Sequence, residues 1–254
     1  MCQSRPWNWA INSAERLAWE ESQGGILLYY GPPGVGKSTI AYHLVDGLQT
    51  KYGTDLNVAV IDVFFPPEDS GPGLINHTLC TILRQLCNKL PTLPEAVIRI
   101  AQRQKAQKWI DCTEIMEAIK VVAEKYSRIF ISVDGVDECG KGMGDVRHVL
   151  HYLFSVQRST KANLFATSRE IPEIIDRFKS QILPRIRARN KDLKQYLNDV
   201  SAGLPFTLLK ENGHILIEIE RLVVSNSDGM LVRTNALMGY IADSKLAGFS
   251  SRSS

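Results

Sequence analysis

The chain has 254 residues, of which 44% are hydrophobic and 22% are charged, a composition typical of an ordinary soluble globular protein. Its net charge of +3 is too small to indicate binding to nucleic acid or to an anionic membrane. No apolar run approaches the about 20 residues that a membrane span needs, and the first residues lack the apolar stretch of a secretory signal. The five cysteines are odd in number and show no C-x-x-C spacing, which argues against disulfides and zinc and favours the cytoplasm.

Strand-like and helix-like segments alternate along most of the chain. Continuous apolar runs predict buried strands at residues 26–30, 57–63, 129–133, 163–167 and 181–186. Helical spacing predicts helices at residues 14–21, from the first strand's glycine loop to about 51, and at 74–90, 95–107, 113–126 and 145–158. This alternation predicts an α/β three-layer sandwich with a five-stranded parallel sheet and right-handed crossovers.

The pattern also predicts how the chain is divided. Residues 1–25 form a helical lead-in, and residues 26–190 form the α/β core. A small, purely helical extension is predicted at 191–230, followed by a divergent and partly disordered tail at 231–254.

The loop after the first strand carries the most specific motif, with the spacing G-x-x-x-x-G-K-[ST] of a phosphate-binding P-loop. A strand, a glycine loop and a helix N-terminus direct backbone N–H groups and a helix dipole at one place, which suits a triphosphate. Lys37 is expected to reach the β- and γ-phosphates, and the Ser38 hydroxyl to bind Mg²⁺. The predicted nucleotide-binding residues are Gly31, Pro32, Pro33, Gly34, Val35, Gly36, Lys37, Ser38 and Thr39.

The strand at 129–133 ends in an acidic residue, as a Walker B strand does. Asp134 is predicted to bind Mg²⁺ at the carboxyl end of this strand. Asp137 and Glu138 follow closely, and either carboxylate could orient or activate the attacking water.

A third element follows the strand at 163–167, which presents Thr167, Ser168 and Arg169 at its carboxyl end. If this strand lies between the P-loop strand and the Walker B strand, these side chains face the γ-phosphate, and Arg169 could stabilise charge there. The alternative is that Arg169 pairs with a structural carboxylate such as Glu170 or Glu173.

These motifs together resemble a NACHT domain, within the signal-transduction class of P-loop NTPases. The segment from Ser132 to Cys139 is the sharpest match, and the segment from Ala166 to Ile174 is similar to the family's sensor segment, which implies a sensor role for Arg169. More narrowly, residues 9–230 resemble fungal NACHT proteins with a nephrocystin-like N-terminal module, which are often followed by ankyrin or WD repeats. The chain departs from that pattern after Met230, so we expect a truncated switch module.

Three functions are compatible with these residues. The first is a slow, Mg²⁺-dependent ATP or GTP hydrolase that acts as a molecular switch in signalling of the innate-immunity type, with assembly into homo-oligomers or with other signalling proteins. The second is a nucleotide-dependent interaction module without catalysis. The third is a small-molecule kinase, suggested by the alternating Arg185, Arg187 and Arg189, although such alternation more often marks a solvated strand face.

Overall fold

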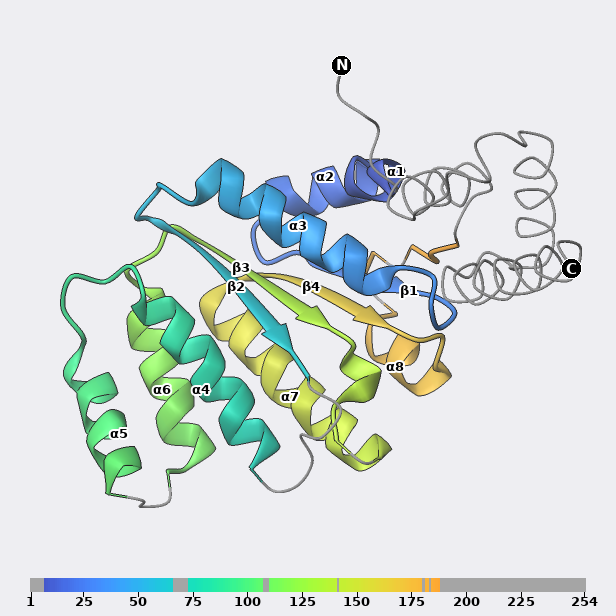
Figure 1. Ribbon diagram of the computed structural model, residues 1–254. Helices are drawn as coiled ribbons and strands as arrows, with labels where there is room; N and C mark the ends of the chain where they lie inside the picture. The colour runs from blue at the N-terminus through green and yellow to red at the C-terminus, as the bar shows by residue number, and fades with distance from the viewer. Residues whose placement is uncertain are drawn as a thin grey trace, which may run out of the picture. The chain divides into compact units, whose positions relative to one another are not determined.

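Four strands form one parallel sheet in the order β1-β4-β3-β2 (Figure 1). The computed structural model describes residues 7–65, 73–106, 110–140, 142–179, 181–182 and 184–187. The strands are β1 (Ile26–Tyr30), β2 (Val58–Phe64), β3 (Arg128–Asp134) and β4 (Asn163–Ser168). β4 lies between β1 and β3, which meets the condition set above for Arg169, so the carboxyl ends of β3 and β4 lie side by side.

Helices supply the crossover connections that parallel neighbours require. The helices are α1 (Asn8–Ile11), α2 (Ala14–Glu21), α3 (Lys37–Tyr52), α4 (Leu74–Cys87), α5 (Glu95–Lys105), α6 (Cys112–Ala123), α7 (Met143–Thr160) and α8 (Pro172–Arg177), with a short 3₁₀ turn, η1 (Val136–Glu138). Side-chain caps fix two of the starts: Ser13 accepts from Arg16 N before α2, and Asp111 accepts from Thr113 N before α6. No helix among the described residues is both long and apolar enough to cross a membrane.

The segment predicted as a fifth strand, residues 181–186, makes only two isolated bridges to β1 in its described part. Leu28 N donates to Ile182 O at 3.0 Å, and Tyr30 N donates to Pro184 O at 3.3 Å. Pro184 has no N–H to return to the ladder, which interrupts a regular strand at this point. The predicted fold class, a parallel α/β sheet of the P-loop NTPase type, is confirmed, while the predicted five-stranded sheet is corrected to four described strands.

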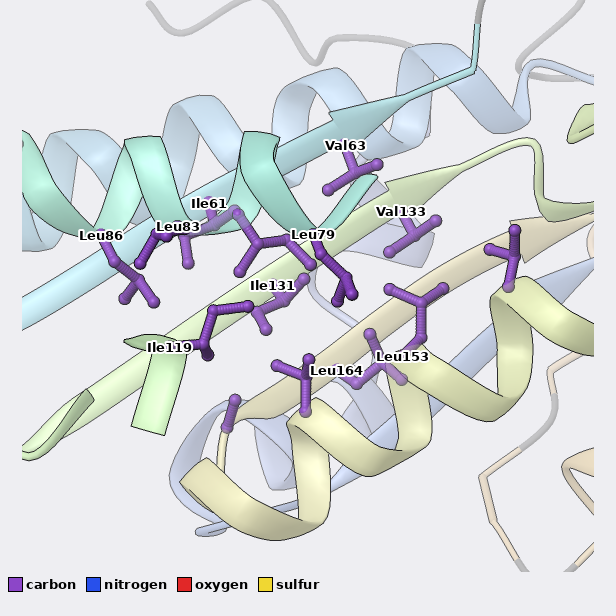
Figure 2. Close-up of a cluster of buried hydrophobic side chains, with 14 of the residues drawn as sticks. Ile61, Val63, Leu79, Leu83, Leu86, Ile119, Ile131, Val133, Leu153 and Leu164 are labelled. Atoms are coloured by element: carbon purple, nitrogen blue, oxygen red, sulfur yellow. The ribbon is translucent and has the colours of Figure 1, made fainter. Parts of the chain in front are cut away.

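One face of the sheet is covered by α4, α6 and α7 (Figure 1). Figure 2 shows Leu79 of α4, Ile119 of α6 and Leu153 of α7 directed toward side chains of the strands, among them Ile61 and Ile131. All five are at most 2% exposed. Burial of apolar side chains of this kind is the main favourable contribution to folding.

The opposite face carries α2 and α3 (Figure 1). The ring of Trp19 in α2 packs against those of Phe130 and Phe165, with 5.6 Å and 6.2 Å between the ring centroids. Its indole N–H donates to Gly25 O and Leu164 O. Helix α2 is therefore attached to β3 and β4 by packing and to the backbone of β4 by a hydrogen bond.

The chain divides into two compact units. The larger unit comprises Ile11–Tyr30 and Lys37–Arg185 and contains the sheet, and the smaller comprises Met1–Ala10, Gly31–Gly36 and Ile186–Ser254. The helical extension predicted at 191–230 and the tail predicted at 231–254 lie outside the described residues. The predicted domain boundaries therefore stay predictions.

Candidate functional site

The loop of the P-loop motif joins β1 to α3 and belongs to the smaller unit. Gly34 and Gly36 have φ values of 70° and 91°, which residues with a Cβ rarely adopt. Left-handed conformations in a loop of this kind create concavities lined by backbone N–H groups, which bind anions. The loop therefore has the backbone conformation that a phosphate cradle needs.

Both ends of this loop are tightly packed within the smaller unit. A Cβ placed on Gly31 would lie 2.4 Å from the carbonyl oxygen of Ile186, and a Cβ on Gly36 would lie 2.7 Å from the indole of Trp7. Trp7 is 1% exposed, and its contact with the loop was not predicted from the sequence. No sequence pattern could reveal this contact, because the two residues are far apart in the chain.

Lys37 is the first residue of α3 in the larger unit. Burial lowers the pKa of its ammonium group, and the charge of Arg169 lowers it further, while the nearby carboxylates Asp137, Asp134 and Glu138 act in the opposite direction. The next two residues, Ser38 and Thr39, are exposed in the first turn of the helix. A half-buried cation beside a helix N-terminus is suited to bind a polyanion.

Asp134, at the end of β3, is held by the end of β4. The Thr167 hydroxyl donates to Asp134 Oδ1 and accepts from Gly135 N at 2.9 Å. Gly135 has a φ of 70° and starts η1, so it turns the chain sharply after the strand. Thr167, which is fully buried, thus fixes the carboxylate predicted to bind Mg²⁺ and also the turn behind it.

The two acids of η1 have different environments. The Asp137 side chain is 3% exposed; its Oδ1 accepts from Arg169 N at 2.9 Å, and its Oδ2 lies 3.0 Å from Arg169 Nε. The Glu138 side chain is 44% exposed and meets Arg169 Nη2 at 3.3 Å. Asp137 is therefore committed to the backbone and side chain of Arg169, whereas Glu138 is largely open to solvent.

Arg169 pairs with these two acids rather than with Glu170 or Glu173, the carboxylates weighed from sequence. Glu170 pairs instead with Arg185, whose Nη2 lies 2.6 Å and whose Nε lies 3.0 Å from Glu170 Oε2. Arg187 is exposed, and Arg189 lies outside the described residues. Of the three arginines on which the kinase hypothesis depends, Arg185 thus forms a surface ion pair.

Within the larger unit, the ends of β3 and β4 and the start of α3 gather a lysine, three carboxylates, an arginine and a buried threonine. Carboxylate and hydroxyl oxygens are the ligands that Mg²⁺ prefers, and Asp134 Oδ1 is already oriented by Thr167. Lys37 and Arg169 carry positive charge, which is the charge that phosphate oxygens require. The donor set therefore fits a nucleotide with Mg²⁺.

Comparison with known proteins supports the same reading of the fold. Residues 7–169 match the family described as nephrocystin 3, N-terminal. No curated protein matches the chain. Among solved structures, the chain is similar to the Orc1 protein of Aeropyrum pernix in complex with DNA, with 12% identity over 93% of this chain and 64% of that chain and a TM-score of 0.55.

Two further structures show the same likeness. One is a DNA replication initiation factor, with 14% identity over 97% of this chain and 65% of that chain and a TM-score of 0.50. The other is a Walker-type ATPase of Pyrococcus abyssi, with 12% identity over 100% of this chain and 79% of that chain and a TM-score of 0.50. The chain thus spans less than two thirds of the length of both replication proteins. At these identities the likeness shows the fold, a P-loop NTPase sheet.

Proposed function

The chain belongs to the nephrocystin 3 N-terminal family, and from this and the site geometry we propose that it is a nucleotide-binding P-loop NTPase that works as a signalling switch of the NACHT type. One observation carries the proposal. Strand β4 lies between β3 and the P-loop strand β1, so Asp134 at the end of β3 lies beside Thr167 of β4. Arg169 follows directly after β4.

In this proposal, residues 31–39 hold the nucleotide. The loop amides and Lys37 bind the phosphates, and Ser38 and Asp134 bind Mg²⁺. Bound Mg²⁺ would neutralise charge on the phosphates. The left-handed glycines of the loop, the place of Lys37 at the start of α3 and the orientation of Asp134 by Thr167 support these roles.

We assign the water-orienting role to Glu138 rather than to Asp137. The Asp137 side chain is buried, accepts a hydrogen bond from Arg169 N and forms an ion pair with Arg169 Nε, so a water molecule has little access to it. Glu138 is four residues beyond Asp134 and open to solvent. Asp137 then acts as a positioning residue that holds Arg169, the proposed sensor of the γ-phosphate.

The spacing Asp134-Gly-Val-Asp-Glu138 and the segment that contains Arg169 support the NACHT assignment. A switch of this kind works when the triphosphate and diphosphate forms differ in their affinity for a partner or for a second copy of the chain. A weak net charge argues against nucleic acid as the partner, although one fold neighbour was solved with DNA. A cytoplasmic location and a fungal-type repeat-associated architecture belong to the same proposal.

Single-turnover hydrolysis and equilibrium binding test the proposal on four proteins: the unchanged chain, Lys37→Ala, Glu138→Gln and Asp137→Asn. We expect Lys37→Ala to lose binding of Mg²⁺-ATP or Mg²⁺-GTP, since a principal phosphate ligand is gone. Glu138→Gln should keep binding and lose hydrolysis. A folded, unchanged chain that binds neither nucleotide would contradict the proposal.

A second candidate function is a nucleotide-dependent interaction module without turnover. The ion pair between Arg169 Nη2 and Glu138 Oε1, at 3.3 Å, favours it, because a carboxylate oxygen that contacts a guanidinium is less available to a water molecule. Nucleotide binding without hydrolysis, together with an oligomeric state that differs between ATP and ADP, would support it. The same oligomeric state with ATP, with ADP and without nucleotide would exclude it.

A further inference from the structure

The indole of Trp7 lies directly against the phosphate loop at Gly36. The three heavy atoms nearest to a Cβ placed on Gly36 all belong to Trp7: Cζ2 at 2.7 Å, Cε2 at 2.8 Å and Nε1 at 3.0 Å. Carbon atoms pack optimally at about 3.5–4.0 Å, so a side chain at position 36 would overlap the ring. The ring therefore occupies the space that every residue except glycine would need.

Both partners of this contact have an unusual backbone. Gly36 has a φ of 91°, and Trp7 has a φ of 73°, which is a genuine outlier for a bulky aromatic residue. Trp7 nevertheless stays 1% exposed, and its carbonyl accepts from Ala10 N at 2.9 Å at the start of α1. Unfavourable backbone conformations persist where surrounding contacts determine them, and they concentrate at functional sites.

The position of Gly36 gives this contact a role beyond packing. Gly36 immediately precedes Lys37, and in a P-loop the backbone N–H groups of such residues face the phosphates. A rigid indole behind Gly36 fixes the orientation of its peptide groups. At the other end of the loop, a Cβ on Gly31 would lie 2.4 Å from the carbonyl oxygen of Ile186, a fully buried residue.

We propose that Trp7 is a positioning residue for the phosphate loop, and that it couples phosphate binding to the conformation of the segment that begins α1. The inference rests on the proposed function, because it requires that the loop binds a nucleotide. Because the indole lies against Gly36, phosphate bound in the loop should change the environment of Trp7.

Two probes separate this role from a purely structural one. Mg²⁺-ADP affinity is measured by calorimetry, and inorganic pyrophosphate is used as a competitor that has phosphates but no base. Trp7→Ala should weaken both by about tenfold, which corresponds to about 1.4 kcal/mol. The control Trp9→Ala removes the neighbouring ring, 6.4 Å from that of Trp7, and should change affinity by less than about threefold, or about 0.6 kcal/mol.

Tryptophan emission gives a second readout that does not depend on the alanine variant folding. The part of the emission that responds to pyrophosphate should be present in the unchanged chain and in Trp9→Phe, and absent in Trp7→Phe. A folded Trp7→Ala protein with unchanged pyrophosphate affinity would overturn the inference, as would an emission response that survives in Trp7→Phe. Weakened ADP binding with unchanged pyrophosphate binding would overturn it too, since that result marks a contact with the base.

The failure of the inference is distinguishable from that of the proposed function. If calorimetry shows no nucleotide binding by the folded, unchanged chain, the proposed function fails and the inference fails with it. If binding is present but Trp7→Ala leaves it unchanged, or the emission response survives in Trp7→Phe, only the inference fails.

Discussion

Loss of charge should lower the unfolding free energy at Asp137 but leave it nearly unchanged at Glu138. Asp137→Asn keeps one side-chain oxygen that can accept a hydrogen bond. Its amide N–H₂ group replaces the other oxygen and faces a second donor, either Arg169 N or Arg169 Nε. Hydrogen bonds to charged groups contribute about 1.5–3 kcal/mol each. Because Arg169 is 52% exposed, solvent screens part of this interaction, so we expect Asp137→Asn to lose about 1–3 kcal/mol of unfolding free energy.

Glu138→Gln provides the matched comparison. The ion pair of Glu138 with Arg169 spans 3.3 Å between two side chains that are about half exposed, and such pairs contribute about 0–1 kcal/mol. Urea unfolding of both variants, in parallel with single-turnover hydrolysis, gives the test. We expect Asp137→Asn to be clearly destabilised, and Glu138→Gln to keep its stability while losing turnover. Equal stability losses in the two variants would refute the assignment of a positioning role to Asp137 and a water-orienting role to Glu138.

Three further predictions follow from described contacts. Thr167→Val removes the hydroxyl that donates to Asp134 and accepts from Gly135 N, so both the unfolding free energy (by about 1–3 kcal/mol) and Mg²⁺-dependent hydrolysis should fall. Unchanged Mg²⁺ dependence would contradict this role. Lys37→Met removes a half-buried ammonium group whose pKa is lowered mainly by burial, so the nucleotide-free variant should be as stable to heat as the unchanged chain, or more stable, although it no longer binds nucleotide. A clear loss of thermal stability would contradict the argument. Burial raises the pKa of Cys139 to about 12, so its thiol should resist alkylation at pH 8 until the protein unfolds. Because the folded state holds this proton more tightly, its contribution to stability is complete below the unfolded pKa and should decrease as pH rises from 9 toward about 12, which denaturant titrations at several pH values would detect.

Sequence periodicity located the regular elements well because they are long and strongly patterned. The strands predicted at 26–30, 57–63, 129–133 and 163–167 agree with β1 to β4 within one residue at each end. Short elements such as α1, η1 and α8 were not predicted, since three to six residues carry too little periodic signal. The segment at 181–186 reads as a strand by its apolar residues, but Pro184 lacks the N–H that a continuous ladder needs.

The candidate site could be predicted as a set of residues but not as a set of contacts. Motif spacing identified Lys37, Asp134 and Arg169, and their convergence followed from the position of β4. The different environments of Asp137 and Glu138 depend on which acid η1 turns toward the end of β4, which spacing does not specify. The contact between Trp7 and Gly36 joins residues 29 positions apart, and only the folded chain reveals it.

The central claim is that this chain binds a nucleotide through the loop at 31–36 and Lys37. Calorimetric titration of the full chain with Mg²⁺-ATP and Mg²⁺-GTP, beside Lys37→Ala, tests it most directly. The account predicts saturable binding of at least one nucleotide by the unchanged chain and its loss in the variant. Binding of equal strength by the folded Lys37→Ala protein, or no binding by the folded, unchanged chain, would contradict it.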